Sequence, residues 1–277
     1  MRRMSVTFLS LVMLLTASGN SDLFAAPRPD LWPRWQAHDQ TSTVKVDHSA
    51  WGQFLKTYLV AGHPSGINRL RYGDITPADR RALSEYLDRL QAISVSALNR
   101  AEQKAYWINL YNALTIKVVL DHYPVGSIRD IGISPGWFSA GPWDAKFLTI
   151  EGKKVSLNDI EHRILRPIWR DNRVHYAVNC ASLGCPNLQP EPFTAENTER
   201  LLERGAREYV NHPRGARIEG GRLTVSSIFD WFQVDFGGSA QKVIEHLRRF
   251  AEPPLREELK AVGSIASYTY DWSLNQP

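Results

Sequence analysis

Cysteine is scarce in this sequence, because Cys180 and Cys185 are the only two in 277 residues. Any thiol chemistry is therefore confined to one short segment. Long apolar runs are also missing, since the block at residues 6–15 is too short to span a bilayer and no later stretch approaches that length. Basic and acidic residues are dispersed without a dense run, so the net charge of +4 gives no argument for nucleic-acid binding. The sequence shows no repeat, low-complexity segment or heptad stretch.

The first residues carry the pattern of a secretory signal. Arginines at positions 2 and 3 precede the apolar block, and small residues follow it around Ala25. We therefore expect residues 1–25 to be a signal peptide that is removed near Ala25. The mature protein is predicted to be soluble, to be periplasmic or secreted, and to have no transmembrane segment.

The rest of the chain is long enough to bury one sizeable core, and its 43% hydrophobic content with nine tryptophans indicates a compact domain. Helical spacing and hairpin turns mix without a strict βαβ alternation. The predicted class is α+β, a single compact domain with a helical N-terminal part and a small, mostly antiparallel sheet. Residues 26–98 are expected to form an N-terminal arm with accessory helices. Residues 99–277 are expected to form the core that carries the histidine and cysteine motif.

Local signals predict individual elements. Thr76 before Pro77, and Asn99 three residues before Glu102, are typical of helix caps, and Asn158 is expected to cap a short helix. Longer helices and helical turns are predicted at residues 49–60, 76–90, 99–122, 195–210, 228–232 and 240–250. Hairpins are predicted about residues 151–152 and 220–221, and a final strand at residues 267–272.

Both cysteines lie in the segment His175-Tyr-Ala-Val-Asn-Cys180-Ala-Ser-Leu-Gly-Cys185-Pro. Residues 173–178 are rich in β-branched and aromatic side chains and predict a buried strand, at whose end Asn179 and Cys180 become accessible. A turn that starts at Cys180 would favour its thiolate through free N–H groups, so Cys180 is a candidate nucleophile. In an oxidising compartment Cys180 and Cys185 can instead form a disulfide that shapes a turn more than it holds the fold.

Two histidines are candidates for the base that would activate Cys180. A regular strand would place His175 and Cys180 on opposite faces, so a turn or bulge at Asn179 would be needed to bring them together. His162 is free of that constraint and can approach Cys180 through the fold, with Glu161 beside it to orient the ring. A metal site made of His175 and the cysteines lacks a fourth ligand and the usual paired spacing, so no metal is predicted.

Polar residues share one side of the predicted helix at residues 99–122. Glu102, Tyr106, Asn109 and Asn112 follow one another at spacings of four, three and three. Asparagine is a poor residue for the middle of a helix, so the two asparagines need an explanation. One interpretation is a buried latch that holds irregular backbone around the cysteines. The other is that Asn109 or Asn112 lines a pocket and donates to an oxyanion or orients a histidine.

Four stretches are distinctive in combination. They are Tyr106-Trp-Ile-Asn-Leu-Tyr-Asn-Ala-Leu-Thr, Asn158-Asp-Ile-Glu-His-Arg-Ile-Leu-Arg, Arg173-Val-His-Tyr-Ala-Val-Asn-Cys-Ala-Ser-Leu-Gly-Cys-Pro and Tyr270-Asp-Trp-Ser-Leu-Asn. In this order they resemble the domain-of-unknown-function 547 family, over about residues 99–236 and the last strand. The resemblance implies little about activity, because that family is largely uncharacterised.

A looser similarity concerns the order of three residue types. Asn179-Cys180 follows both His162 and His175, as in permuted papain-like and transglutaminase-like thiol enzymes, in which the histidine precedes an Asn-Cys pair. This similarity implies a papain-like or transglutaminase-like fold. It also implies attack by a cysteine on a carbonyl group.

Two classes of function follow. In the first, the protein is a cysteine-dependent hydrolase or acyltransferase that acts on amide, peptide or thioester bonds. Cys180 is then the nucleophile, His162 or His175 is the base, and Glu161 or an asparagine orients the ring. The predicted substrate-binding or oxyanion residues are Asn109, Asn112 and Asn179.

In the second class, the protein is a non-catalytic envelope binding or interaction module with a structural Cys180–Cys185 disulfide. The loop at residues 136–143 then presents Trp137, Phe138 and Trp143 to a small molecule, a peptide or an envelope protein. Neither class needs a cofactor, and no nucleic-acid partner is expected.

Overall fold

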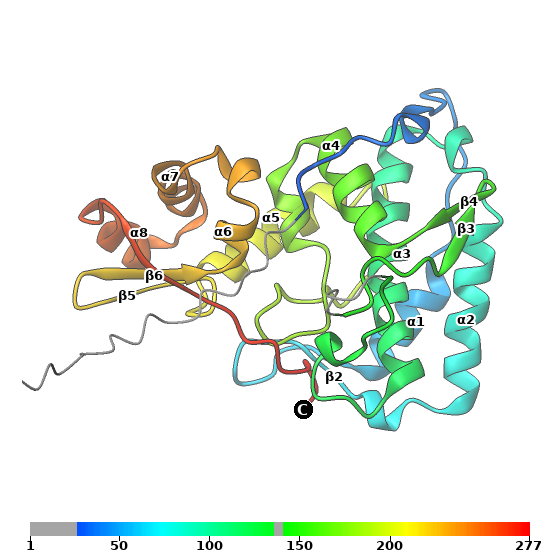
Figure 1. Cartoon of the computed structure of the whole chain (residues 1–277), viewed down its shortest axis with the longest axis horizontal. Coiled ribbons are helices and arrows are strands. Elements are labelled where there is room, and N and C mark those ends of the chain that lie inside the picture. The colour runs from blue at the N-terminus through cyan, green and yellow to red at the C-terminus, as the bar shows by residue number, and fades with distance from the viewer. Residues whose placement is uncertain (1–26, 136–140) are drawn as a thin grey trace, which may run out of the picture.

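The computed structural model describes residues 27–135 and 141–277 (Figure 1). The predicted signal segment, Trp137 and Phe138 lie outside these residues. Helices dominate the fold and the strands are short, so the α+β class predicted from the sequence is confirmed.

The α-helices follow the predicted order with one addition. They are α1 (Ser49–Tyr58), α2 (Pro77–Gln91), α3 (Arg100–His122), α4 (Arg166–Trp169), α5 (Thr198–Val210), α6 (Ile228–Trp231), α7 (Ala240–Phe250) and α8 (Pro253–Lys260). The sequence patterns did not predict α8. Two predicted caps are present, since Thr76 accepts the Asp79 N–H at 3.1 Å and Asn99 accepts the Glu102 N–H at 3.0 Å.

The strands form three small sheets in the described part of the chain. They are β1 (Leu59–Val60) with β2 (Arg69–Leu70), β3 (Leu148–Ile150) with β4 (Lys153–Val155), and β5 (Ala216–Glu219), β6 (Arg222–Ser226) and β7 (Ile265–Thr269) in that order. The hairpins β3–β4 and β5–β6 are antiparallel and turn where the sequence predicted. Strand β7 pairs with β6 in parallel.

Helix α3 runs through the larger of two hydrophobic cores, with α1 and α2 on one side of it (Figure 1). Trp35 and Trp51, which come before the predicted core domain, are buried in this same cluster, and Trp35 meets Trp107 of α3 edge to face at 5.1 Å. The second core lies among α5, α6, α7, α8 and the three-stranded sheet. The cysteine segment connects elements of both cores.

The strand predicted at residues 173–178 is wrong. The chain forms a 3-10 helix, η6 (Asn172–Tyr176), which begins where the Asp171 side chain accepts the Arg173 N–H at 3.0 Å. Lys104 of α3 also binds the Asp171 carboxylate at 2.9 Å. The β propensity of a segment takes effect only when a neighbouring strand is present to pair with it. Here the ion pair between Lys104 and Asp171 fixes a helical turn instead.

The cap predicted at Asn158 is also wrong. Asn158 is itself helical, and its side chain donates to Asp144 at 2.8 Å. Ser156 opens the helix instead, since its hydroxyl accepts the Asp159 N–H at 3.1 Å while Asp159 accepts the Ser156 N–H at 2.9 Å. The helix continues as a π-helix, η5 (Asp159–Leu165). Such helices are rare in proteins, and those that occur often lie at functional sites.

The N-terminal arm crosses this π-helix before it reaches the first core (Figure 1). Asp30 N–H donates to His162 O and Trp32 N–H donates to Arg163 O, both at 3.0 Å. A short 3-10 helix, η1 (Pro33–Gln36), follows. Within residues 27–135 and 141–277, every helix is too short or too polar to cross a membrane.

Candidate functional site

The cysteines lie in a loop between η6 and α5 that Asn179 holds from within. The Asn179 side chain accepts the Ala181 N–H at 2.8 Å and donates to Pro186 O at 2.7 Å. Ala181 has φ 61°, in the left-handed region that a residue with a Cβ adopts at a cost. The residue next to Cys180 is thus held in a strained conformation by a buried amide.

Asn112 and Asn109 of α3 bind backbone on either side of this loop. Asn112 donates to Ala177 O at 2.9 Å and accepts the Asn179 N–H at 2.8 Å. Asn109 donates to Phe193 O at 2.7 Å and accepts the Phe193 N–H at 3.0 Å. Both asparagines therefore bind backbone groups, as the interpretation of a buried latch requires. Neither side chain forms a hydrogen bond with a cysteine or a histidine in the described part of the chain.

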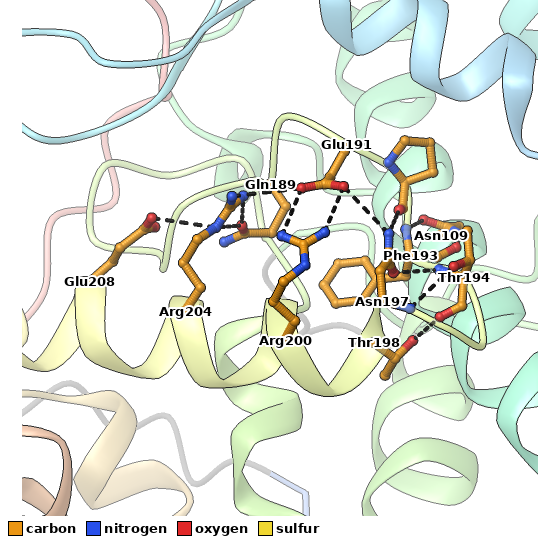
Figure 2. A network of polar contacts seen from close by, with 11 residues as sticks. Asn109, Gln189, Glu191, Phe193, Thr194, Asn197, Thr198, Arg200, Arg204 and Glu208 are labelled. Atoms are coloured by element: carbon orange, nitrogen blue, oxygen red, sulfur yellow. Dashed lines mark hydrogen bonds and ion pairs between the residues drawn. The ribbon is translucent and has the colours of Figure 1, made fainter.

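Figure 2 shows the surroundings of the Asn109 contact. The segment that carries Phe193 is tied to α5 by Asn197, which donates to Pro192 O at 2.9 Å, and by Glu191, which pairs with Arg200 at 2.9 Å. This network fixes the chain that leaves the cysteine loop.

The C-terminal tail pairs with the cysteine loop through three backbone hydrogen bonds, which we call the clasp. Leu183 N–H donates to Ser273 O at 2.8 Å, Gly184 N–H donates to Asp271 O at 2.7 Å, and Asn275 N–H donates to Ala181 O at 3.0 Å. A Cβ at Gly184 would lie 2.8 Å from Asp271 N, so the close pairing of tail and loop requires glycine at this position. The clasp brings Tyr270 to the cysteines.

Tyr270 joins the two thiols through one hydroxyl. Its oxygen lies 3.1 Å from the sulfur of Cys180 and donates to the sulfur of Cys185 at 3.1 Å. The Cys180 backbone N–H also donates to the Cys185 sulfur, at 2.9 Å, and the Ser182 hydroxyl lies 3.1 Å from the Cys180 sulfur. Both cysteines are free thiols in this structure. Cys180 is partly exposed and Cys185 is buried.

The two sulfurs have opposite tendencies to ionise. Burial alone would raise the pKa of Cys185, but hydrogen bonds from the Cys180 thiol and the Tyr270 hydroxyl and from the Cys180 N–H lower it to about 7. Burial and the hydrogen bond to Cys185 raise the pKa of Cys180 well above its ordinary value. The pair therefore carries one negative charge most readily on Cys185, whereas the sequence pointed to Cys180.

The predicted bases occupy a separate buried cluster, formed by Glu161, His162, Arg166, His175 and Asp235. His175 Nε2 lies 2.7 Å from Asp235, whose carboxylate also binds Arg166 at 2.6 Å. His162 Nδ1 lies 2.9 Å from an Arg166 nitrogen, and Glu161 lies 3.7 Å from His175 Nδ1. In the described part of the chain, no hydrogen bond joins either histidine to a cysteine.

Electrostatics keep the carboxylates of this cluster charged and one imidazole neutral. Burial opposes ionisation of Glu161 and Asp235, but the histidines and Arg166 outweigh it and lower both pKa values to about 2. Burial lowers the pKa of His162 to about 4. His175 stacks on Phe232 with ring centres 4.2 Å apart. The cluster is a buried ionic network in which His175 Nδ1 has no hydrogen-bond partner among the described residues.

Tyr111 of α3 interacts electrostatically with both the ionic cluster and the thiols. Its buried hydroxyl is beside Glu161, and burial, Glu161 and the two cysteines raise its pKa well above the ordinary value. Tyr111 is therefore a neutral phenol. Trp143, predicted to be part of a binding loop, is half-buried and meets Trp272 at 5.8 Å.

Sequence reasoning did not find all of the groups that surround the thiols and histidines. Tyr270 lies in one of the quoted motifs, but no spacing signal connected it to cysteines 85 and 90 residues away. Asp235 carried no signal at all. The described residues contain no group of three or more His, Cys, Asp or Glu side chains arranged to hold a metal ion.

Comparison with known protein families finds a match in the middle of the chain. Residues 95–210 match the model of the family described as "Protein of unknown function, DUF547". No curated protein and no solved structure matches the chain. The matched range contains α3, the π-helix, both cysteines and α5, whereas Asp235 and Tyr270 lie beyond it. The resemblance inferred from the sequence motifs is therefore confirmed over residues 95–210, which are similar to the DUF547 family.

Proposed function

We propose that the protein is a thiol–disulfide exchange protein whose reactive centre is the pair Cys180 and Cys185. One observation carries this proposal: the Cys185 sulfur accepts the Cys180 N–H at 2.9 Å and the Tyr270 hydroxyl at 3.1 Å. These two donors stabilise a thiolate without any histidine. With the pKa of Cys185 at about 7, roughly half of these thiols are ionised at neutral pH.

The reduced pair can react with an external disulfide, R–S–S–R′. Cys180, the more exposed cysteine, attacks one sulfur while its proton passes to the Cys185 thiolate, and R′–S⁻ leaves. Cys185 then gives that proton to R′–S⁻ and attacks the Cys180 sulfur, which releases R–S⁻. Two electrons have moved to the substrate, and the protein holds a Cys180–Cys185 disulfide.

The reverse reaction uses the same asymmetry. An external thiolate attacks the exposed Cys180 sulfur of the oxidised pair, and Cys185 leaves as a thiolate. A thiol of low pKa is the better leaving group, so the donors around Cys185 favour this direction of cleavage. The Cys180–Cys185 disulfide predicted from the sequence is then the oxidised state of the pair, and the two free thiols are its reduced state.

A hydrolase with a Cys–His pair has less support. His162 and His175 are engaged by Arg166 and by carboxylates in their own buried cluster. The amides of Asn109 and Asn112 hold backbone groups, so they do not present donors to an oxyanion. Export, which the arginines and apolar block at the start of the chain predict, would place the thiol pair in an oxidising compartment.

The test is oxidation of the reduced full-length mature protein by glutathione disulfide, followed by alkylation and mass spectrometry. Wild type should form the Cys180–Cys185 bridge and release two molecules of glutathione per chain. Cys185→Ser should stop at a mixed disulfide on Cys180. Cys180→Ser should react more slowly, because its remaining thiol is buried.

Ser182→Ala is the matched control, since this hydroxyl contacts the Cys180 sulfur but takes no part in electron transfer. It should give the same products as wild type. If both thiols of wild type persist in excess glutathione disulfide, the protein is not an exchange protein. If wild type accumulates a stable mixed disulfide, Cys185 does not resolve it.

A further inference from the structure

A surface pocket of about 350 Å³ lies beside the cysteine loop, within the size range of small-molecule sites. Gly184 of the loop and Tyr270 of the tail line it, and Arg214, Arg217 and Asp271 bring three charged groups to it. Tyr270 connects the pocket to the thiols, because this residue lines the pocket and its hydroxyl contacts both sulfurs. A molecule in the pocket therefore lies one aromatic side chain from the reactive pair.

Arg214 is held rigidly but its charge is not neutralised. It donates to Leu183 O at 3.0 Å and to the Asn187 side chain at 2.7 Å, and its guanidinium lies 5.4 Å from the centre of the Tyr209 ring. Both hydrogen-bond acceptors are uncharged. Its Nε is buried without a partner, and none of the ion pairs in the described part of the chain includes Arg214. A fixed guanidinium of this kind favours a carboxylate ligand.

Arg217 and Asp271 provide one further charge of each sign. Arg217 pairs with Glu219 at 3.6 Å, but Glu219 is 80% exposed, so solvent weakens this pair and Arg217 remains available to a ligand. Asp271 is exposed, and one of its oxygens accepts the Ser273 N–H at 2.9 Å. The second oxygen accepts no hydrogen bond within the described residues. The pocket thus offers two guanidinium groups and one carboxylate.

We propose that this pocket binds the free α-amino acid end of a small peptide-type disulfide or thiol. Arg214 and Arg217 would receive its carboxylate, and Asp271 would receive its ammonium group. The γ-glutamyl spacer of such a ligand would extend from the pocket past Tyr270, whose hydroxyl contacts both sulfurs. The inference rests on the proposed exchange function and names the substrate class of that site.

The binding test uses S-methylglutathione, which has the amino acid end but no reactive sulfur. Isothermal titration calorimetry of the reduced full-length protein should show saturable binding. Arg217→Gln should weaken binding by about tenfold, the usual loss for one charge-assisted contact. Asp271→Asn should also weaken it. Arg222→Gln, an exposed arginine on the same hairpin but outside the pocket, is the control and should bind like wild type.

A kinetic test compares two disulfides. Glutathione disulfide should oxidise wild type with a rate that saturates, whereas cystamine, which lacks carboxylates, should not saturate. Arg217→Gln should abolish this difference. If S-methylglutathione fails to bind, or binds Arg217→Gln as tightly as wild type, the pocket assignment is overturned while exchange can still be observed with both disulfides. If neither disulfide oxidises the thiols, the exchange function itself fails, whatever the calorimetry shows.

Discussion

At the scale of single residues, Tyr270 contributes to the low pKa of Cys185. Its hydroxyl donates to Cys185, and this contact is among those that lower the Cys185 pKa. We expect Tyr270→Phe to raise that pKa, so in a Cys180→Ser background the pH midpoint of Cys185 alkylation should be higher with Tyr270→Phe than without it. Tyr268→Phe, two residues earlier, is the control. An unchanged midpoint in Tyr270→Phe would show that the hydroxyl does not stabilise the thiolate.

Asn112 is the residue on which the shape of the cysteine loop most depends. Replacing it by Leu leaves Ala177 O and Asn179 N–H buried without partners, so unfolding free energy should fall by about 1–3 kcal/mol. Asn109→Leu should have a similar effect through Phe193. Asn158→Leu, which loses one exposed contact, should cost less. Equal denaturation midpoints for Asn112→Leu and wild type would contradict the latch.

The candidate cysteines and histidines could be identified from the sequence, but the residues that contact them could not. Cys180 and Cys185 stand out because they are the only cysteines, and the polar spacing on α3 indicated a latch. The contact of Tyr270 with the sulfurs depends on the register between the tail and residues 181–184, which no local pattern encodes. His175 was grouped with the cysteines because it is close to them in sequence, and His162 because it could approach them through the fold. Contacts with Asp235 and Arg166 hold the two histidines in a separate cluster.

At the scale of elements, local interactions were predictable and tertiary ones were not. The caps at Thr76 and Asn99 were found because each bond spans three residues. The 3-10 helix η6 was mistaken for a strand because Lys104, 67 residues away, helps to fix its first turn through Asp171. Local secondary-structure propensity gives wrong predictions in segments whose conformation depends on ion pairs with distant residues.

The pairing of the C-terminal tail with the cysteine loop gives an element-scale prediction. Gly184→Ala puts a Cβ 2.8 Å from Asp271 N and 2.9 Å from Asp271 O, so the tail must move away. We expect a lower melting temperature and slower alkylation of Cys185 at pH 7, because Tyr270 moves with the tail. Gly263→Ala, where a Cβ has no neighbour within 4 Å, should behave like wild type. Normal alkylation kinetics in Gly184→Ala would show that Tyr270 keeps its place without the clasp.

At the scale of the whole molecule, the ionic cluster connects the two cores. Asp235 precedes Phe236 of the second core, and it binds Arg166, which follows Leu165 of the first. The same cluster receives the N-terminal arm, because Arg166 donates to Pro27 O at 2.6 Å. Its charges therefore influence global stability.

Stability should fall with acid in two stages. Burial lowers the pKa values of His48, His162 and His246 from 6.5 to about 4, so the unfolded chain binds more protons as pH falls through this window. Glu161 and Asp235, with pKa values lowered to about 2, add a second loss below their ordinary values of 4.5 and 3.8. Urea unfolding between pH 7 and 3 measures this. A flat profile from pH 6.5 to 4 would contradict neutral buried histidines.

Processing of the N-terminus is the remaining whole-chain prediction. Arginines at positions 2 and 3 and the apolar block at residues 6–15 predict removal of residues 1–25 on export. The intact mass of protein from the periplasm or medium should correspond to a chain that begins within a few residues of Ala26. A cytoplasmic product that retains Met1 would disprove the signal.

The clasp by residues 271–275 has a consequence for how the protein is made. Synthesis delivers the N-terminal part first, so Cys180 and Cys185 emerge 90 and 85 residues before Tyr270. During that interval neither sulfur has its phenolic partner, and the thiols react as those of a flexible chain. The poised pair thus exists only in a finished molecule, and a nascent or truncated chain is the form most open to wrong disulfides.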